Sequence, residues 1–174
     1  MSDCEFGLRF SLSSCEVEVD DVVERLGAAG CDDATVGIGR KGRLALDFIR
    51  KAESPERAVL SAIADVRRAI PDAALLEASP DLVGLTDIAE VFGVTRQNTR
   101  KLILECDALA PAPVHEGKPA LWHLAGVLEW LRDQKGYAVA DDLMALARAT
   151  MQVNLAIREK DVDQAAQREI LALL

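Results

Sequence analysis

The side chains best suited to recognising another molecule gather in one short segment, residues 95–101. They are a hydroxyl, two amides and three cations: Thr95, Arg96, Gln97, Asn98, Arg100 and Lys101. Arginine can donate two hydrogen bonds to guanine, asparagine or glutamine can pair in the same way with adenine, and the remaining cations can contact phosphates. Residues 95–104 contain three basic side chains and no acidic one. This pattern is typical of a helix that reads the major groove of double-stranded DNA.

The residues around this segment fit a helix-turn-helix. Ala89 is small where two helices would cross, and Gly93 supplies the left-handed conformation that a tight turn between them needs. Thr95 can cap the second helix. The apolar residues expected on the inner face are Ile88, Phe92, Val94 and Leu102. The alternative interpretation is an ordinary helical hairpin whose second helix has a solvated, charged face.

Residues 82–134 resemble the winged helix-turn-helix of the MerR and phage-excisionase type. The resemblance rests on the segments 85–102, 111–114, 117–119, 121–123 and 127–131. It implies that the prolines lead into a short β-wing, that a glycine turns the wing, and that a helix ending in Trp-Leu packs back on the motif. By the same resemblance the polar residues of 95–101 become groove and phosphate contacts, and His115 and Lys118 become wing contacts.

The first eighty residues alternate between strand and helix patterns. Apolar residues fall on every second position, as in half-buried strands, in the segments 5–12, 34–38 and 44–48. We expect one helix from Asp20, acting as its N-cap, to about Ala29, and a second that starts at Ser54 and ends before Pro71. A short strand at 74–76 completes the order β-α-β-β-α-β, which is that of ferredoxin-like domains.

Strand signals nearly vanish after residue 80, and helices are expected at 86–92, 95–106, 124–133 and 139–159, with a shorter one after 161. The fold class is therefore α+β. We expect a ferredoxin-like domain over 1–80, a winged helix-turn-helix over 81–136 and C-terminal helices over 137–174.

One stripe of the C-terminal helix resembles a dimer seam. Its members recur at three- and four-residue spacing: Leu143, Leu146, Thr150, Val153 and Ile157. The stripe can pack on its own domain or pair with a second chain. Because regulators that read two half-sites bind DNA as dimers, we favour a homodimer formed by these helices.

The sequence offers no set of residues for catalysis. It contains no Ser-His-Asp set, no paired acid–base carboxylates and no phosphate-loop lysine, and its four cysteines lack C-x-x-C spacing. Asp32 and Asp33 are adjacent, so in a strand they would point to opposite faces rather than converge on a cation, and a turn explains them better. We expect no enzyme activity, no cofactor and no metal.

The charge and composition limit the partners. The chain of 174 residues has a formal net charge of −9, yet its acidic residues avoid the segment 95–104. Half of the residues are apolar, but no run approaches the roughly 20 needed to span a membrane, and the acidic N-terminus does not resemble a signal peptide. We therefore expect a cytoplasmic protein with no membrane partner.

Two functions remain open at this point. The favoured one is sequence-specific DNA binding by a homodimeric transcriptional regulator whose N-terminal domain binds a protein or a small ligand. The alternative is an interaction protein, such as an antitoxin or a defence-system accessory. In that case the N-terminal domain, with ten basic and fifteen acidic side chains in residues 1–80, binds a protein partner and DNA binding is secondary.

Overall fold

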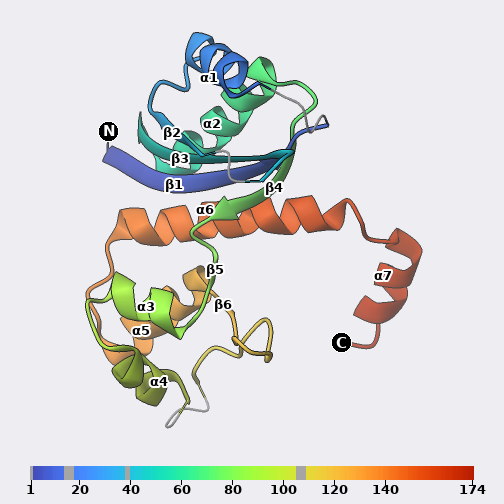
Figure 1. Ribbon diagram of the computed structural model, residues 1–174. Helices are drawn as coiled ribbons and strands as arrows, with labels where there is room; N and C mark the ends of the chain where they lie inside the picture. The colour runs from blue at the N-terminus through green and yellow to red at the C-terminus, as the bar shows by residue number, and fades with distance from the viewer. Residues whose placement is uncertain (1, 14–17, 38–39, 105–108) are drawn as a thin grey trace.

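The computed structural model describes residues 2–13, 18–37, 40–104 and 109–174. Its N-terminal part follows the predicted order, with β1 (Ser2–Ser11), α1 (Val19–Ala28), β2 (Ala34–Gly37), β3 (Arg43–Ala52), α2 (Pro55–Ala69) and β4 (Ala74–Ser79). The strands form one antiparallel sheet in the order β2-β3-β1-β4. Both α1 and α2 lie on the same face of this sheet (Figure 1). The predicted α+β class is confirmed.

The alternation in the sequence decides which sheet face is buried. Every second residue of β1, from Cys4 to Phe10, points toward the helices and is buried, and Leu44, Leu46 and Phe48 of β3 do the same. The rings of Phe6 and Phe48 stack at a centroid distance of 5.2 Å. The opposite face of the sheet keeps its polar side chains exposed, as a one-sided antiparallel sheet requires.

Some element boundaries differ from the prediction. Glu18, not Asp20, stands at the N-cap of α1 and gives no side-chain cap, so Asp20 lies inside the first turn. Ser54 caps α2 as expected, accepting a hydrogen bond from the Arg57 backbone N–H at 3.2 Å. The strand expected at 74–76 continues to Ser79 because it pairs with β1 along its length. Residues 38 and 39, predicted as strand end and turn, lie outside the described residues.

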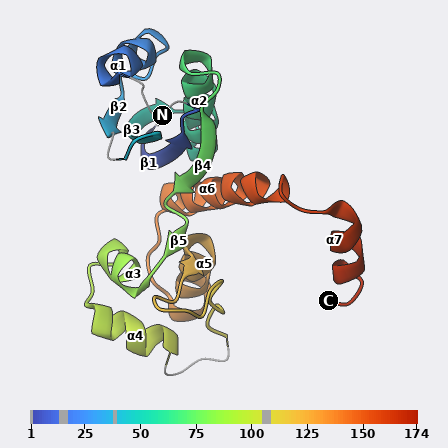
Figure 2. The ribbon, with the colours of Figure 1, turned by 45° about the vertical axis from the view of Figure 1, so that its right-hand side comes forward.

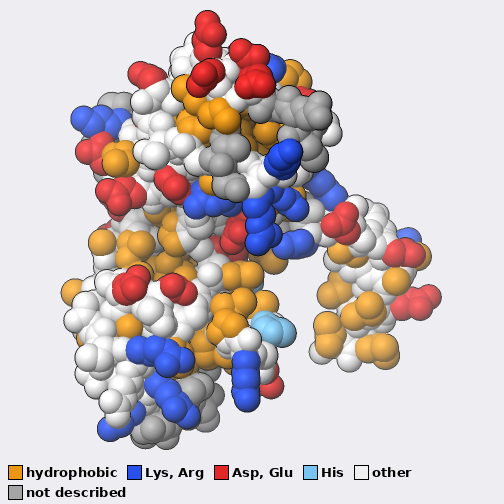
Figure 3. All heavy atoms as spheres, viewed as in Figure 1, with side chains coloured by type: hydrophobic (Ala, Val, Ile, Leu, Met, Phe, Trp, Pro, Cys, Tyr) orange, Lys and Arg blue, Asp and Glu red, His pale blue; other side chains and the backbone are white. Residues whose placement is uncertain are grey.

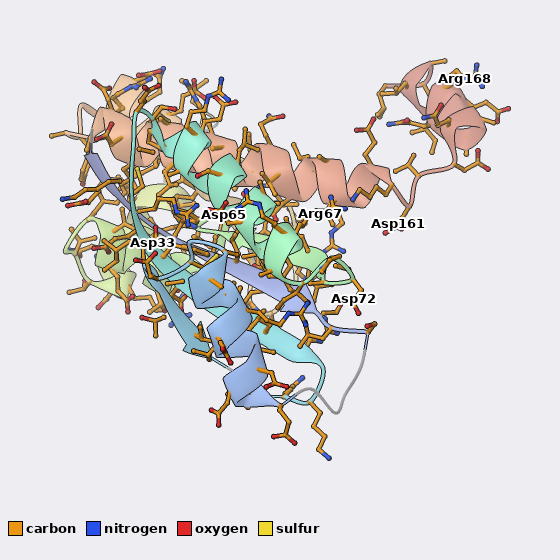
Figure 4. The ribbon with its side chains drawn as sticks, turned by 90° about the horizontal axis from the view of Figure 1, so that it is seen from above. Asp33, Asp65, Arg67, Asp72, Asp161 and Arg168 are labelled. Atoms are coloured by element: carbon orange, nitrogen blue, oxygen red, sulfur yellow. The ribbon has the colours of Figure 1, made fainter. Side chains whose placement is uncertain are left out.

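A buried arginine joins three elements of this domain. Arg50 of β3 is 6% exposed and donates two hydrogen bonds to the carboxylate of Asp33, at 2.7 and 3.0 Å, and one to Asp65 of α2 at 2.8 Å. Asp33 and Asp65 are labelled in Figure 4. Burial works against the charged guanidinium, but the hydrogen bonds and charges of the two carboxylates outweigh it and raise the pKa of Arg50. Asp33 is thus the partner of a structural ion pair.

A second unit follows in the chain. It contains β5 (Leu82–Val83), α3 (Leu85–Val91), α4 (Arg96–Leu104), β6 (Trp122–His123) and α5 (Leu124–Lys135). Its core is built around Trp122 and Trp130, which are 1% and 5% exposed, together with Leu124 and Leu128. Figure 2 shows this unit below the sheet, with α3 and α4 on one side of α5. Trp130, in the Trp-Leu end of α5, packs into this core, as the resemblance implies.

Helix α6 (Asp141–Glu159) lies between the two units and belongs to both cores. Leu146 and Val153 pack into the core of the sheet domain, whereas Met144 and Ala147 pack into the core of the second unit. Thr150 is fully buried between them. Most of the stripe predicted to pair with a second chain is therefore packed within this chain, which agrees with the alternative that the stripe packs on its own domain.

Hydrogen bonds fix α6 against the segment that connects the two units. Asn154 accepts from the Ala78 N–H at 2.8 Å and donates to the Ala78 carbonyl and the Asp81 carboxylate, both at 2.7 Å. Asp81, which is 2% exposed, also contacts His123 Nδ1 at 2.6 Å. One buried carboxylate thus connects α6 with β6, and the arrangement of the two units depends on it.

We expect Asn154→Ala to lower the free energy of unfolding by about 2 kcal/mol, because the change leaves the Ala78 N–H without its partner and removes one of the two side-chain partners of the buried Asp81 carboxylate. Urea unfolding measures the effect. The control is Gln152→Ala, an exposed position on the same helix, for which a change within about 0.5 kcal/mol is expected. Equal effects of the two substitutions would show that the contacts of Asn154 contribute little.

The last helix, α7 (Gln164–Leu171), stands away from the rest of the molecule in Figures 1 and 4. None of its residues is buried, and Ile170 and Leu171 are 56% and 62% exposed. Among the described residues, no helix has the length and apolar character needed to cross a membrane.

Candidate nucleic-acid interface

The helix-turn-helix is formed by α3, a short turn and α4. Ala89 is 4% exposed at the contact between the helices, and its carbonyl accepts a hydrogen bond from the Val94 N–H at 2.9 Å. Gly93 adopts a φ of 62°, the left-handed conformation that was predicted for this turn. Ile88 is 2% exposed below the turn. The sequence therefore predicted both the sharp turn and the packing that closes it.

The two glycines at 93 and 126 allow a matched test of this turn. An added Cβ would meet nothing within 4 Å at either position, but only Gly93 has a positive φ. We expect Gly93→Ala to lower the free energy of unfolding by about 1 kcal/mol, the strain of a left-handed alanine. Gly126→Ala, inside α5, is expected to be neutral or to stabilise by about 0.5 kcal/mol. Thermal unfolding measures the stability of both variants. Equal stability of the two would contradict the turn geometry.

The orientation of α4 is set by its N-cap and its buried side. The hydroxyl of Thr95 accepts a hydrogen bond from the Asn98 N–H at 3.2 Å, as predicted for a capping residue. Thr99 and Ile103 face inward and are 1% and 5% exposed. At 100° per residue, this places Lys101 and Gln97 on the outer side of the helix, and Arg96 and Arg100 on one flank of its buried side. The end predicted at residue 106 lies outside the described residues.

The remaining predicted residues of α4 occupy the outer face and its flanks. Arg96, Arg100 and Lys101 are exposed, and none of them forms an ion pair with a described residue. Asn98 and Lys101 border a hollow of about 370 Å³, which also includes Tyr137 and Phe92. Asn98 therefore lies on the flank of the helix nearest α5. The free outer face is rich in donors, which suits phosphate oxygens and the acceptor edges of bases.

The predicted wing corresponds to a narrow loop before β6. The His115 and Leu121 backbones form an antiparallel bridge, with the Leu121 N–H donating to the His115 carbonyl at 3.0 Å. The indole N–H of Trp122 donates to the Pro111 carbonyl at 3.0 Å and so ties the base of the loop to the core. Both His115 and Lys118 are exposed on this loop.

The cations of α4 and the loop before β6 are visible on one side of the molecule. Figure 3 shows Lys and Arg side chains over α4, and a histidine and a further cation over the loop. The cations of α4 and those of the loop are thus seen on the same side of the molecule. This arrangement can contact a polyanion at two places.

Sequence reasoning missed the residues that support this face from behind. The sequence predicted no role for Asp81, which pairs with His123, or for Asn154, which pairs with Asp81. The only available signal was the aspartate that follows Pro80, between the two predicted domains. Among the described residues, no group of three or more His, Cys, Asp or Glu side chains is placed to hold a metal ion.

Comparison of the chain with protein-family models, with curated proteins and with solved structures gives no match. The function must therefore be inferred from the residues and their geometry.

Proposed function

We propose that the protein binds double-stranded DNA in a sequence-specific way, with α4 in the major groove and the loop that carries His115 and Lys118 beside it on the backbone. The observation that carries the proposal is the outer face of α4. It presents Gln97 and Lys101 away from the buried side, on a helix capped by Thr95. Arg96 and Arg100 are exposed on one flank, and none of the three cations forms an ion pair with a described residue. A merely solvated helix in a chain of net charge −9 has no reason to exclude acids from this face.

The arrangement around α4 agrees with the winged helix-turn-helix of the MerR and phage-excisionase type. A helix pair with a left-handed glycine is followed by a bridged loop and by a helix, α5, that contributes Trp130 and Leu131 to the core. The order β2-β3-β1-β4 of the sheet agrees with a ferredoxin-like N-terminal domain. In this proposal the N-terminal domain senses a ligand or a partner, and the protein acts as a cytoplasmic transcriptional regulator.

The proposal retains a homodimer, but through another surface than the α6 stripe. The proposal places the contact on α7, where Ile170 and Leu171 are exposed apolar residues. Two copies would read half-sites spaced by about one helical turn of DNA, ~10 base pairs, or a multiple of it. Analytical ultracentrifugation of the full chain tests this part, and a monomer at all concentrations would contradict it.

The DNA-binding proposal is tested by selecting duplexes from a randomised pool with the full chain and measuring their affinity by fluorescence anisotropy. We expect a recurring sequence to be enriched and to bind at nanomolar concentration. The opposite result is a pool that remains random after repeated selection, because a protein without base contacts enriches no sequence.

A further inference from the structure

The open face of the N-terminal sheet contains a second place where cations gather. Gly37, Ala45 and Arg9 lie side by side on neighbouring strands, because Ala45 pairs with both of the others. Because Gly37 and Ala45 have little or no side chain, they leave the sheet surface beside the Arg9 guanidinium uncovered. Together with Arg40 and Arg43 they border a hollow of about 350 Å³. We call this place the arginine hollow.

The guanidinium of Arg9 is held in position. Its Nη1 lies 2.9 Å from Asp47 Oδ1 and 3.3 Å from the carbonyl oxygen of Leu46. Gly7 lies beside this pair: a Cβ there would come within 2.9 Å of the same Asp47 oxygen and within 3.1 Å of Arg9 Nη1. The remaining edge of the Arg9 guanidinium forms no hydrogen bond with a described residue.

The other two arginines have no partner in the described part of the chain. Arg40 and Arg43 are exposed and take part in no ion pair or side-chain hydrogen bond with described residues. Every charged residue that borders the hollow is an arginine, although residues 1–80 contain more acids than bases. Figure 3 shows Lys and Arg side chains gathered at this end of the sheet. Asp47 offsets the charge of Arg9, so the charges of Arg40 and Arg43 are the ones that a bound anion would neutralise.

We propose that the arginine hollow binds a phosphate group. Arginine presents paired N–H donors that match phosphate oxygens, and a cluster of arginines is suited to more than one phosphate oxygen at a time. The volume of the hollow lies within the range of small-molecule sites. The phosphate can belong to a small phosphorylated ligand or to the backbone of a nucleic acid. The site does not depend on α4, so it stands whether or not α4 binds DNA.

The first arm of the test uses inorganic pyrophosphate and the full chain, with binding measured by isothermal titration calorimetry. We expect saturable binding by the wild type and a loss of about tenfold or more in Arg40→Gln/Arg43→Gln. The control, Arg57→Gln/Arg67→Gln on α2, removes the same charge at exposed positions and should leave binding unchanged. Circular dichroism checks that each variant is folded, which is expected because all four side chains are exposed.

The second arm identifies the source of the phosphate. If it is a nucleic-acid backbone, Arg40→Gln/Arg43→Gln reduces the slope of log affinity for duplex DNA against log salt concentration by about 2, whereas the control pair does not. An unchanged slope together with lost pyrophosphate binding assigns a small phosphorylated ligand. If the wild type binds no DNA, the pyrophosphate arm alone decides. The proposal is overturned if neither pyrophosphate binding nor the slope changes more in this pair than in the control.

Discussion

Replacing Arg50 with methionine is expected to lower the free energy of unfolding by about 3 kcal/mol. The change removes the cation from between Asp33 and Asp65, whose side chains are only 28% and 19% exposed. Two carboxylates would then face each other in a poorly solvated place. The backbone carbonyl of Gly30 and the hydroxyl of Ser61 would also lose their Arg50 donors, at 3.2 and 3.1 Å.

Two further variants separate the geometry of this ion pair from its charge. Arg50→Lys keeps the charge but cannot donate two parallel hydrogen bonds to Asp33, so we expect about 2 kcal/mol of destabilisation. Arg57→Met, at an exposed position of α2, should change stability by no more than about 0.5 kcal/mol. Urea unfolding monitored by circular dichroism gives all three values. An Arg50→Met protein as stable as Arg57→Met would refute the role of the buried guanidinium.

Replacing Arg96 and Arg100 together with alanine is expected to weaken binding to a selected DNA sequence by about 100-fold or more. Each arginine that donates two hydrogen bonds to a base contributes about 1–3 kcal/mol, and tenfold in affinity corresponds to about 1.4 kcal/mol. Because both side chains are exposed and have no ion-pair partner among the described residues, the fold should be unaffected.

The matched control for this variant is Arg57→Ala/Arg67→Ala, which makes the same change in net charge on α2. Since the distant charges are screened beyond about 8 Å at physiological salt, its effect on DNA affinity should be small. Lys118→Ala, on the loop before β6, should weaken binding evenly across sequences and reduce the salt slope by about 1. If the two double variants bound DNA alike, α4 would not be the reading helix.

Local patterns explain why much of the fold follows from the sequence. The period of two in residues 5–12 and 44–48 predicted β1 and β3, because one sheet face is buried and the other is not. Ser54 followed by proline predicted the start of α2, and Gly93 predicted the turn between α3 and α4. These signals depend only on residues that are neighbours in the chain.

Prediction from the sequence failed where a residue contacts partners that are distant along the chain. An amphipathic helix has the same pattern whether it packs on a second chain or on its own, so the stripe of α6 could not reveal that Leu146 lies in this chain's core. Similarly, Arg40 lies between β2 and β3, and nothing local in the sequence places it in the same hollow as Arg9, which is brought there by the pairing of β1 with β3. Two-residue strands such as β5 carry too few residues for any period.

The residues of the candidate DNA-binding face were predicted more fully than the contacts that hold the two units together. All the predicted contact residues in the segment 95–101 and both wing residues are exposed, as the helix-turn-helix pattern indicates. Asp81 and Asn154 are separated by 73 residues and meet only in the folded chain. Such a contact has no periodic signal, so the sequence could not predict how the two units are held together.

The most direct test of the central claim is the ratio of two dissociation constants, one for the selected duplex and one for a shuffled duplex of equal length and composition at the same salt concentration. If α4 reads bases, the wild type should prefer the selected sequence by about 1,000-fold or more. In Arg96→Ala/Arg100→Ala the preference should fall by about 100-fold. A wild-type ratio near one, or a double variant that keeps the full preference, would contradict sequence reading by α4.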